Sequence, residues 1–201
     1  SLETINSTIG RFLGPLTAGL LIEFSGFTGA YVVLLIGYSL AFVSIALVKS
    51  RIPVQASRSA PVLRNLASGI RYSWDNPVIR AVLMITLIMN ALAFSVEALF
   101  PVVARDHLRV GPGLTGLLIS AQAIGSFVSA LIIASRQNIR FHGRIFILGI
   151  SLQLISLFLF ALSPWYAVSF ILLLLLGFGS AGFSTMQSTI ILIASSHAMR
   201  G

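Results

Sequence analysis

Residues 49–80 read KSRIPVQASRSAPVLRNLASGIRYSWDNPVIR and carry most of the positive charge of the chain. Six basic residues and one acidic residue, Asp75, give this segment a net +5 of the formal +8. The sequence on both sides is strongly apolar and almost uncharged. Because lysine and arginine are translocated poorly, a basic segment between long apolar runs is typical of a cytoplasmic loop between membrane spans.

The second half of this segment predicts a short helix along the inner membrane surface. Pro61 can open a helix, and Asn76-Pro77 ends it. Such a helix would lie with its apolar side on the membrane and with Arg64 and Arg71 toward anionic headgroups. The alternative is a disordered tether. The apolar residues at helical spacing are Leu63, Leu66, Ala67, Ile70 and Trp74.

The composition identifies a membrane protein. Of the 201 residues 57% are hydrophobic and 9% charged, with a mean hydropathy of +0.99, whereas soluble domains average about 25% charged residues. The pI near 11.4 does not indicate a nucleic-acid partner, because the basic residues stand at the ends of apolar runs. The absence of cysteine excludes thiolate metal sites, and three scattered histidines predict no metal and no cofactor. The first residue is not Met and the chain ends in a polar turn, so we expect a fragment.

Six runs are apolar and long enough to cross a bilayer as helices. We therefore predict an all-α integral protein that crosses the inner (plasma) membrane several times. Basic residues place the N-terminus, the linker 49–80, the loop 135–144 and the C-terminus in the cytoplasm. The loop 104–113 is equivocal, because it carries both signs of charge. The predicted spans are 2–22, 30–48, 79–103, 114–134, 145–163 and 166–194.

The first span combines small residues, a proline and a charge. Gly10, Gly14 and Ala18 recur every four residues, a spacing that permits close helix contact. Pro15 removes one hydrogen bond and predicts a bend. Arg11 lies inside the apolar run, so it either faces a cavity or partner or extends its charge back to the interface.

Polar side chains on the later spans are candidates for a shared substrate cavity. They are Asn90, Gln122, Gln153 and Gln187, and each one alone has the simpler interpretation of a hydrogen bond between helices. Glu97 shares a predicted helix face with Asn90. If it is buried it is a candidate proton carrier, and otherwise it is a solvated carboxylate at the outer interface.

Several motifs resemble one family of transporters. Residues 10–19, GRFLGPLTAG, look like GxxxGPxxGG, the antiporter signature of the fifth helix of the major facilitator superfamily, with Ala18 and Gly19 at its end. Residues 65–72, 76–77 and 101–106 are similar to the ends of helix seven in the drug and siderophore exporter branch. Gly116-Leu-Leu followed by Gly125 resembles helix eight. The pairs Gly143-Arg144 and Arg200-Gly201 resemble intracellular turns, without the acidic residue usual before Gly143.

The resemblance implies a division into three parts. Residues 1–48 would be the last two helices of the N-terminal six-helix bundle, residues 49–80 the cytoplasmic linker, and residues 81–201 the first four helices of the C-terminal bundle. The chain would then cover helices five to ten of twelve.

The resemblance also implies a function. We expect proton-coupled efflux of a small amphipathic molecule, a drug or a siderophore, by alternating access. Arg11 and Glu97 are the charged coupling candidates. The implied partners are the substrate, the proton and membrane lipid, and the full-length protein would work as a monomer.

Two other classes of protein compete with a transporter. A non-transporting membrane scaffold or partner subunit is favoured if the polar faces are buried in tight contacts between helix pairs. An intramembrane enzyme is disfavoured. The run Gly179-Ser-Ala-Gly182 places its serine wrongly for a protease loop, no histidine lies in an apolar span, and no GxxxxGK[ST] phosphate loop is present.

Overall fold

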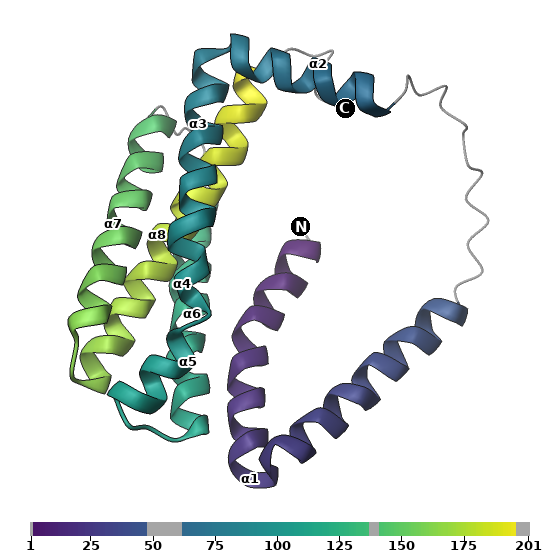
Figure 1. The fold of residues 1–201 in the computed structure, drawn as a ribbon, viewed down its shortest axis with the longest axis vertical. Helices are drawn as coiled ribbons and strands as arrows, with labels where there is room; N and C mark the ends of the chain where they lie inside the picture. The colour runs from purple at the N-terminus through teal and green to yellow at the C-terminus, as the bar shows by residue number, and fades with distance from the viewer. Residues whose placement is uncertain (1, 48–61, 137–140, 196–201) are drawn as a thin grey trace.

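The computed structural model describes residues 2–47, 62–136 and 141–195, and these residues form helices without a strand. The predicted all-α fold is therefore confirmed. Apolar helices that follow one another in the chain run in alternating directions (Figure 1). Within the described residues five helical segments are long and apolar enough to span a membrane: Phe12–Leu47, Pro77–His107, Pro112–Ser135, His142–Leu162 and Tyr166–Ala194.

The first two predicted spans are joined as one element, α1 (Leu2–Leu47), which reverses direction at Gly26. Gly26 has φ 67° and ψ −177°, a combination that is almost restricted to glycine. A break at this one residue replaces the expected loop. The first arm of α1 lies beside the bundle, and the second arm stands apart from it (Figure 1). From Tyr31 to Leu47 the side chains of the second arm are exposed.

The predicted linker helix is present as α2 (Val62–Asp75) and lies across one end of the bundle (Figure 1). Its place on the membrane surface stays a prediction. Asn76 joins it to the next helix, α3 (Pro77–Ile88). The Asn76 Oδ1 atom accepts hydrogen bonds from the backbone N–H groups of Val78 and Ile79, at 3.1 and 3.3 Å. Its Nδ2 atom donates to the carbonyl of Ala194, at 3.3 Å. One side chain thus caps α3 and ties it to the end of the last helix.

The segment Pro77–His107, which corresponds to the third predicted span, contains two turns of π-helix. After α3 come η1 (Met89–Phe94), α4 (Ser95–Glu97), α5 (Phe100–Val102) and η2 (Val103–His107). A π-helical turn contains one extra residue, which offsets the following side chains by about 100° from the α-helical pattern. The shared face predicted for Asn90 and Glu97 rests on uninterrupted α-helical spacing, which η1 breaks.

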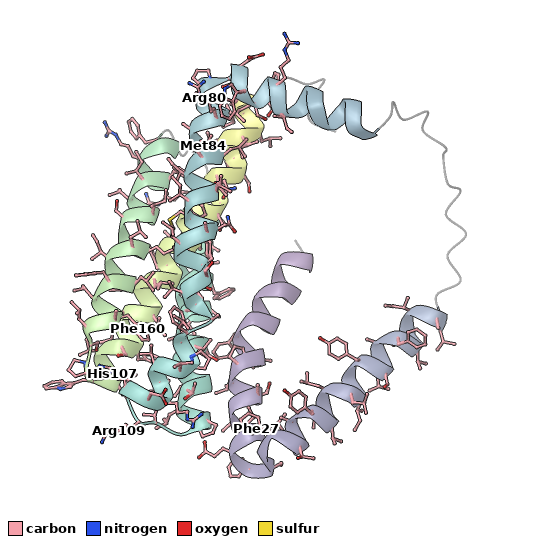
Figure 2. All side chains as sticks on the ribbon, in the orientation of Figure 1. Phe27, Arg80, Met84, His107, Arg109 and Phe160 are labelled. Carbon is pink, nitrogen blue, oxygen red and sulfur yellow. The ribbon has the colours of Figure 1, made fainter. Side chains whose placement is uncertain are left out.

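The centre of the bundle is α8 (Tyr166–Ala194), against which α6 (Pro112–Ser135) and α7 (His142–Leu162) both pack. Leu173, Leu176, Phe183 and Met186 of α8 are buried in two apolar clusters. Figure 2 places Arg80 at the end of the bundle that bears α2, and His107 and Arg109 at the opposite end, where α1 reverses near Phe27.

Gly26→Ala is expected to destabilise the protein by about 1–3 kcal/mol, because a Cβ atom disfavours this backbone conformation. The melting temperature of the purified protein in detergent measures this change. Gly37→Ala is the matched control, since Gly37 is helical and has open space around its Cα atom. Equal melting temperatures for the two variants would show that the break does not need glycine.

The two roles of Asn76 can be separated by substitution. Asn76→Asp keeps an acceptor for α3 but loses the donor to Ala194, whereas Asn76→Ala loses both. We expect Asn76→Ala to cost about 1–2 kcal/mol for the helix cap alone and Asn76→Asp to melt between it and the wild type. A melting temperature of Asn76→Asp at or below that of Asn76→Ala would contradict the capping role.

Candidate functional site

The first arm of α1 touches α6 backbone to backbone. A Cβ atom added to Gly19 would lie 3.0 Å from the Cα atom of Gly116. A Cβ atom added to Gly116 would collide with the carbonyl oxygen of Pro15. Both glycines are buried. We call this contact the α1–α6 seam and define it by Phe12, Pro15, Gly19 and Glu23 of α1 with Gly113, Gly116 and Ser120 of α6.

Two polar contacts close the seam above and below the glycines. The Glu23 carboxylate accepts a hydrogen bond from the backbone N–H of Gly113, at 2.7 Å. This N–H lies in the first turn of α6, where the helix itself supplies no acceptor. The hydroxyl of Ser120 donates to the carbonyls of Phe12 and Gly116, at 3.0 and 2.8 Å. Neither Glu23 nor Ser120 is among the residues predicted from the sequence, although the small residues at 113, 116 and 120 share one helix face.

The antiporter-like residues divide between two faces of α1. Pro15 and Gly19 lie in the seam, whereas Gly10, Gly14 and Ala18 are exposed. Gly14 and Ala18 line an apolar groove between the two arms of α1. A packing role for these three residues therefore stays a prediction, as does the role of Arg11, whose side chain lies outside the described part of the structure.

Next to the seam, a cavity of about 270 Å³ lies between α1, α4 and α6. Glu97 and Gln122 both line it, and the Gln122 Nε2 atom donates to Glu97 Oε1 at 2.9 Å. Ser126 and Pro15 complete the side toward α6 and α1. The volume is slightly below the range of about 300–1,000 Å³ found for ligand pockets, so the cavity suits water or part of a ligand.

Glu97 is placed inside the apolar segment and not at its end. It precedes His107, the last residue of that segment, by ten positions, which corresponds to about 15 Å along a helix. Gln122 follows Pro112 by the same number of positions on the neighbouring, oppositely directed helix. The two residues therefore meet at similar depth, and Glu97 is half-buried. The structure thus joins two of the residues that the sequence predicted.

The other polar candidates lie elsewhere in the bundle. Asn90 is exposed and donates to the carbonyl of Thr86, at 2.8 Å. Gln153 of α7 is 1% exposed, and its Oε1 atom has no hydrogen-bond partner among the described residues. Gln187 is half-buried on α8 and does not line the cavity that holds Glu97. A common substrate cavity for all four polar candidates stays a prediction.

Gly143 and Arg144 are exposed at the start of α7, and the Arg144 guanidinium stacks 4.6 Å from the centre of the Phe141 ring. Arg200 and Gly201 lie outside the described residues. Within residues 2–47, 62–136 and 141–195, no group of His, Cys, Asp or Glu side chains has the geometry of a metal site.

The fold and the sequence together define the family. A family model described as transmembrane secretion effector, a group within the major facilitator superfamily, matches residues 1–197. The chain belongs to this family of transporters, and its apolar helices make it a multi-pass protein of the inner membrane. The predicted membership is confirmed.

Curated relatives narrow the comparison to exporters. The chain is 23% identical, over its whole length, to 48% of the enterobactin exporter EntS of Shigella boydii serotype 18. It is 24% identical over 96% of its length to 46% of EntS from Escherichia coli O81. The chain thus spans about half the length of the curated relatives it matches. No solved structure matches it significantly.

A bulky side chain at the seam should separate α1 from α6. Gly116→Leu is expected to cost about 3 kcal/mol, the upper end for overpacking, because the atoms it meets are backbone and cannot rotate away. Gly111→Leu is the matched control, since Gly111 has open space and an extended backbone. Thermal unfolding in detergent compares the two variants, and equal unfolding temperatures would contradict the close contact between α1 and α6.

Proposed function

We propose that the protein to which this chain belongs is a secondary-active exporter that couples the entry of protons to the efflux of a small amphipathic molecule. The observation that supports this proposal most directly is the Glu97–Gln122 pair in a cavity beside the seam. A siderophore is one member of the substrate class, because the curated relatives are enterobactin exporters. A drug is another.

Glu97 is the proposed proton carrier. A carboxylate surrounded by membrane helices is costly unless it is hydrogen-bonded, reached by water or neutralised by a proton. In its charged form Glu97 accepts the hydrogen bond from Gln122. Protonation removes the charge and makes Glu97 a donor, so the pair has to rearrange. Substrate that competes for Gln122 would thereby be linked to the protonation of Glu97.

The seam is proposed to contribute to alternating access. If the expected division holds, α1 belongs to the N-terminal bundle and α6 to the C-terminal bundle. The seam then joins the two bundles that rock against each other. Glycine backbones make a flat contact that can form and separate without the rearrangement of large side chains. The cavity next to the seam would gain or lose access to water when the two helices separate.

The orientation follows from charge and is also a proposal. The end with α2, Arg80, Arg136 and Arg144 would face the cytoplasm, because arginine is enriched on that side. The end with the reversal at Gly26 would face outward. The full-length protein is proposed to work as a monomer.

A non-transporting scaffold is the second candidate, and one observation favours it. Gln153 is buried where α7 crosses α8, beside the backbone of Gly179, which is the tight pairwise contact expected of a structural polar residue. The scaffold differs from the exporter in one measurable respect, which is movement of substrate against a gradient.

Glu97→Gln in the complete protein is the decisive variant. We expect it to abolish export driven by a pH gradient. Substrate exchange without a gradient should stay within about fivefold, the value of one hydrogen bond, because the amide keeps the shape and one acceptor. Proteoliposomes loaded with substrate measure both activities. The control is Asp106→Asn, because Asp106 is 66% exposed and pairs with Arg105 at 3.6 Å.

The outcomes separate the candidates. Loss of gradient-driven export in Glu97→Gln but not in Asp106→Asn supports the proposed carrier. Normal gradient-driven export in Glu97→Gln would remove that role. No substrate movement by the wild type, at normal abundance and with several amphipathic substrates, would favour the scaffold.

A further inference from the structure

An apolar groove of about 550 Å³ runs between α6 and α7, with α8 as its floor. It exists because α6 and α7 both pack along α8 and contact each other little. Gly179 and Gly182 of α8 form part of this floor, and Gly149 of α7 lies beside them where the backbones of the two helices touch. Its walls include Ile132 of α6 and Leu148 of α7, and the Leu148 side chain is 67% exposed.

The mouth of this groove is positively charged. Arg136 follows the end of α6, Arg144 lies in the first turn of α7, and both line the groove with Phe141. In the first turn of α7 the N–H groups of Arg144 and Ile145 donate to the carbonyl of Phe141. Phe141 supplies no side-chain cap, so an anion there would be bound by the first N–H groups of the helix, those of His142 and Gly143. None of the acidic side chains that the structure describes lines the groove. A positive mouth thus opens onto a long apolar channel.

We propose that this groove binds a phospholipid with an anionic headgroup. Arg136, Arg144 and the start of α7 hold the phosphate, and one acyl chain lies over the glycine floor between Ile132 and Leu148. Basic pockets between membrane helices are suited to anionic lipids because the charge and the hydrocarbon are satisfied together. A soluble phosphate would use only the arginines and leave the apolar channel uncovered. The groove shares no lining residue with the cavity that holds Glu97, so the proposal does not depend on the transport mechanism.

The first test measures lipid preference. The complete protein is purified in mild detergent and mixed with equal amounts of phosphatidylglycerol and phosphatidylethanolamine, and native mass spectrometry measures the retained lipids. The wild type should retain phosphatidylglycerol preferentially. The double variant Arg136→Gln/Arg144→Gln should lower its affinity about 30-fold, because each arginine near a membrane surface contributes a factor of about five.

The matched charge control is Arg105→Gln/Arg109→Gln, which removes the same charge elsewhere: Arg105 lies in η2, and Arg109 lies at the opposite end of the bundle (Figure 2). It should keep the preference. A control that loses affinity as strongly as the groove variant would overturn the proposal, because attraction would then depend on total charge. Melting temperatures within a few degrees of wild type show that the variants are folded, which is expected because Arg136 and Arg144 are both exposed.

The second test asks whether an acyl chain fills the groove. Leu148→Trp narrows it without a change of charge and should lower phosphatidylglycerol retention. Leu154→Trp, on an exposed part of the same helix outside the groove, should not. Glycerol phosphate, which has the phosphate but no acyl chain, should not displace the lipid at equal concentration.

Three results would each overturn the proposal. They are equal retention of the neutral lipid, displacement by glycerol phosphate, and unchanged retention in Leu148→Trp. A fourth is a large loss of thermal stability in lipid-free Leu148→Trp but not in Leu154→Trp, because that would mean that a protein segment occupies the groove.

Discussion

The contact between the backbones of Gly19 and Gly116 is the constraint on which the arrangement of the first arm depends. Lipid tails are as apolar as leucine, so membrane helices gain little from burying large apolar side chains against each other. Close backbone contact and hydrogen bonds between helices must supply the attraction instead. The seam has both, since Glu23 and Ser120 bond across it on either side of the glycines.

The same construction holds the rest of the bundle together. Gly125 of α6 lies against the backbone of Leu174 in α8, and Gly177 of α8 lies against the backbone of Gln122. Gly149 of α7 and Gly179 of α8 approach each other at the second crossing. The Gly177 contact has a further effect, because it fixes the backbone of the residue that bonds Glu97. Packing and the candidate site therefore share one helix crossing.

Hydropathy and turn residues predicted where the helices lie in the sequence. They did not predict which face each helix turns toward the bundle or which helices pack together. Apolar runs predict the spans because a helix needs about 20 apolar residues to cross a bilayer. Asn76-Pro77 predicts the junction of α2 and α3 because proline disfavours the α-helical conformation of the residue before it. The face that Glu97 presents depends on the π-helical turn at Met89–Phe94, for which residue spacing gives no signal. Glu23 directly follows the first predicted span, 2–22, and its partner Gly113 lies 90 positions away in the sequence. Of the glycines in the first span, Gly19 contacts α6 whereas Gly10 and Gly14 do not. Which glycine makes the contact depends on the position of α6, which the sequence of the first span does not contain.

Because Glu23 bonds Gly113 near the end of α6, the two ends of the seam differ in the free-energy cost of separating α1 from α6. Gly113 is the second residue of α6, close to the aqueous boundary, so water can replace the carboxylate there once the helices part. Ser120 lies about 10 Å further along the helix, where its hydrogen bond to the carbonyl of Phe12 would be lost with no water to replace it. Separation of α1 from α6 is therefore least costly when it begins near Gly26, where α1 reverses, and proceeds from there toward Ser120.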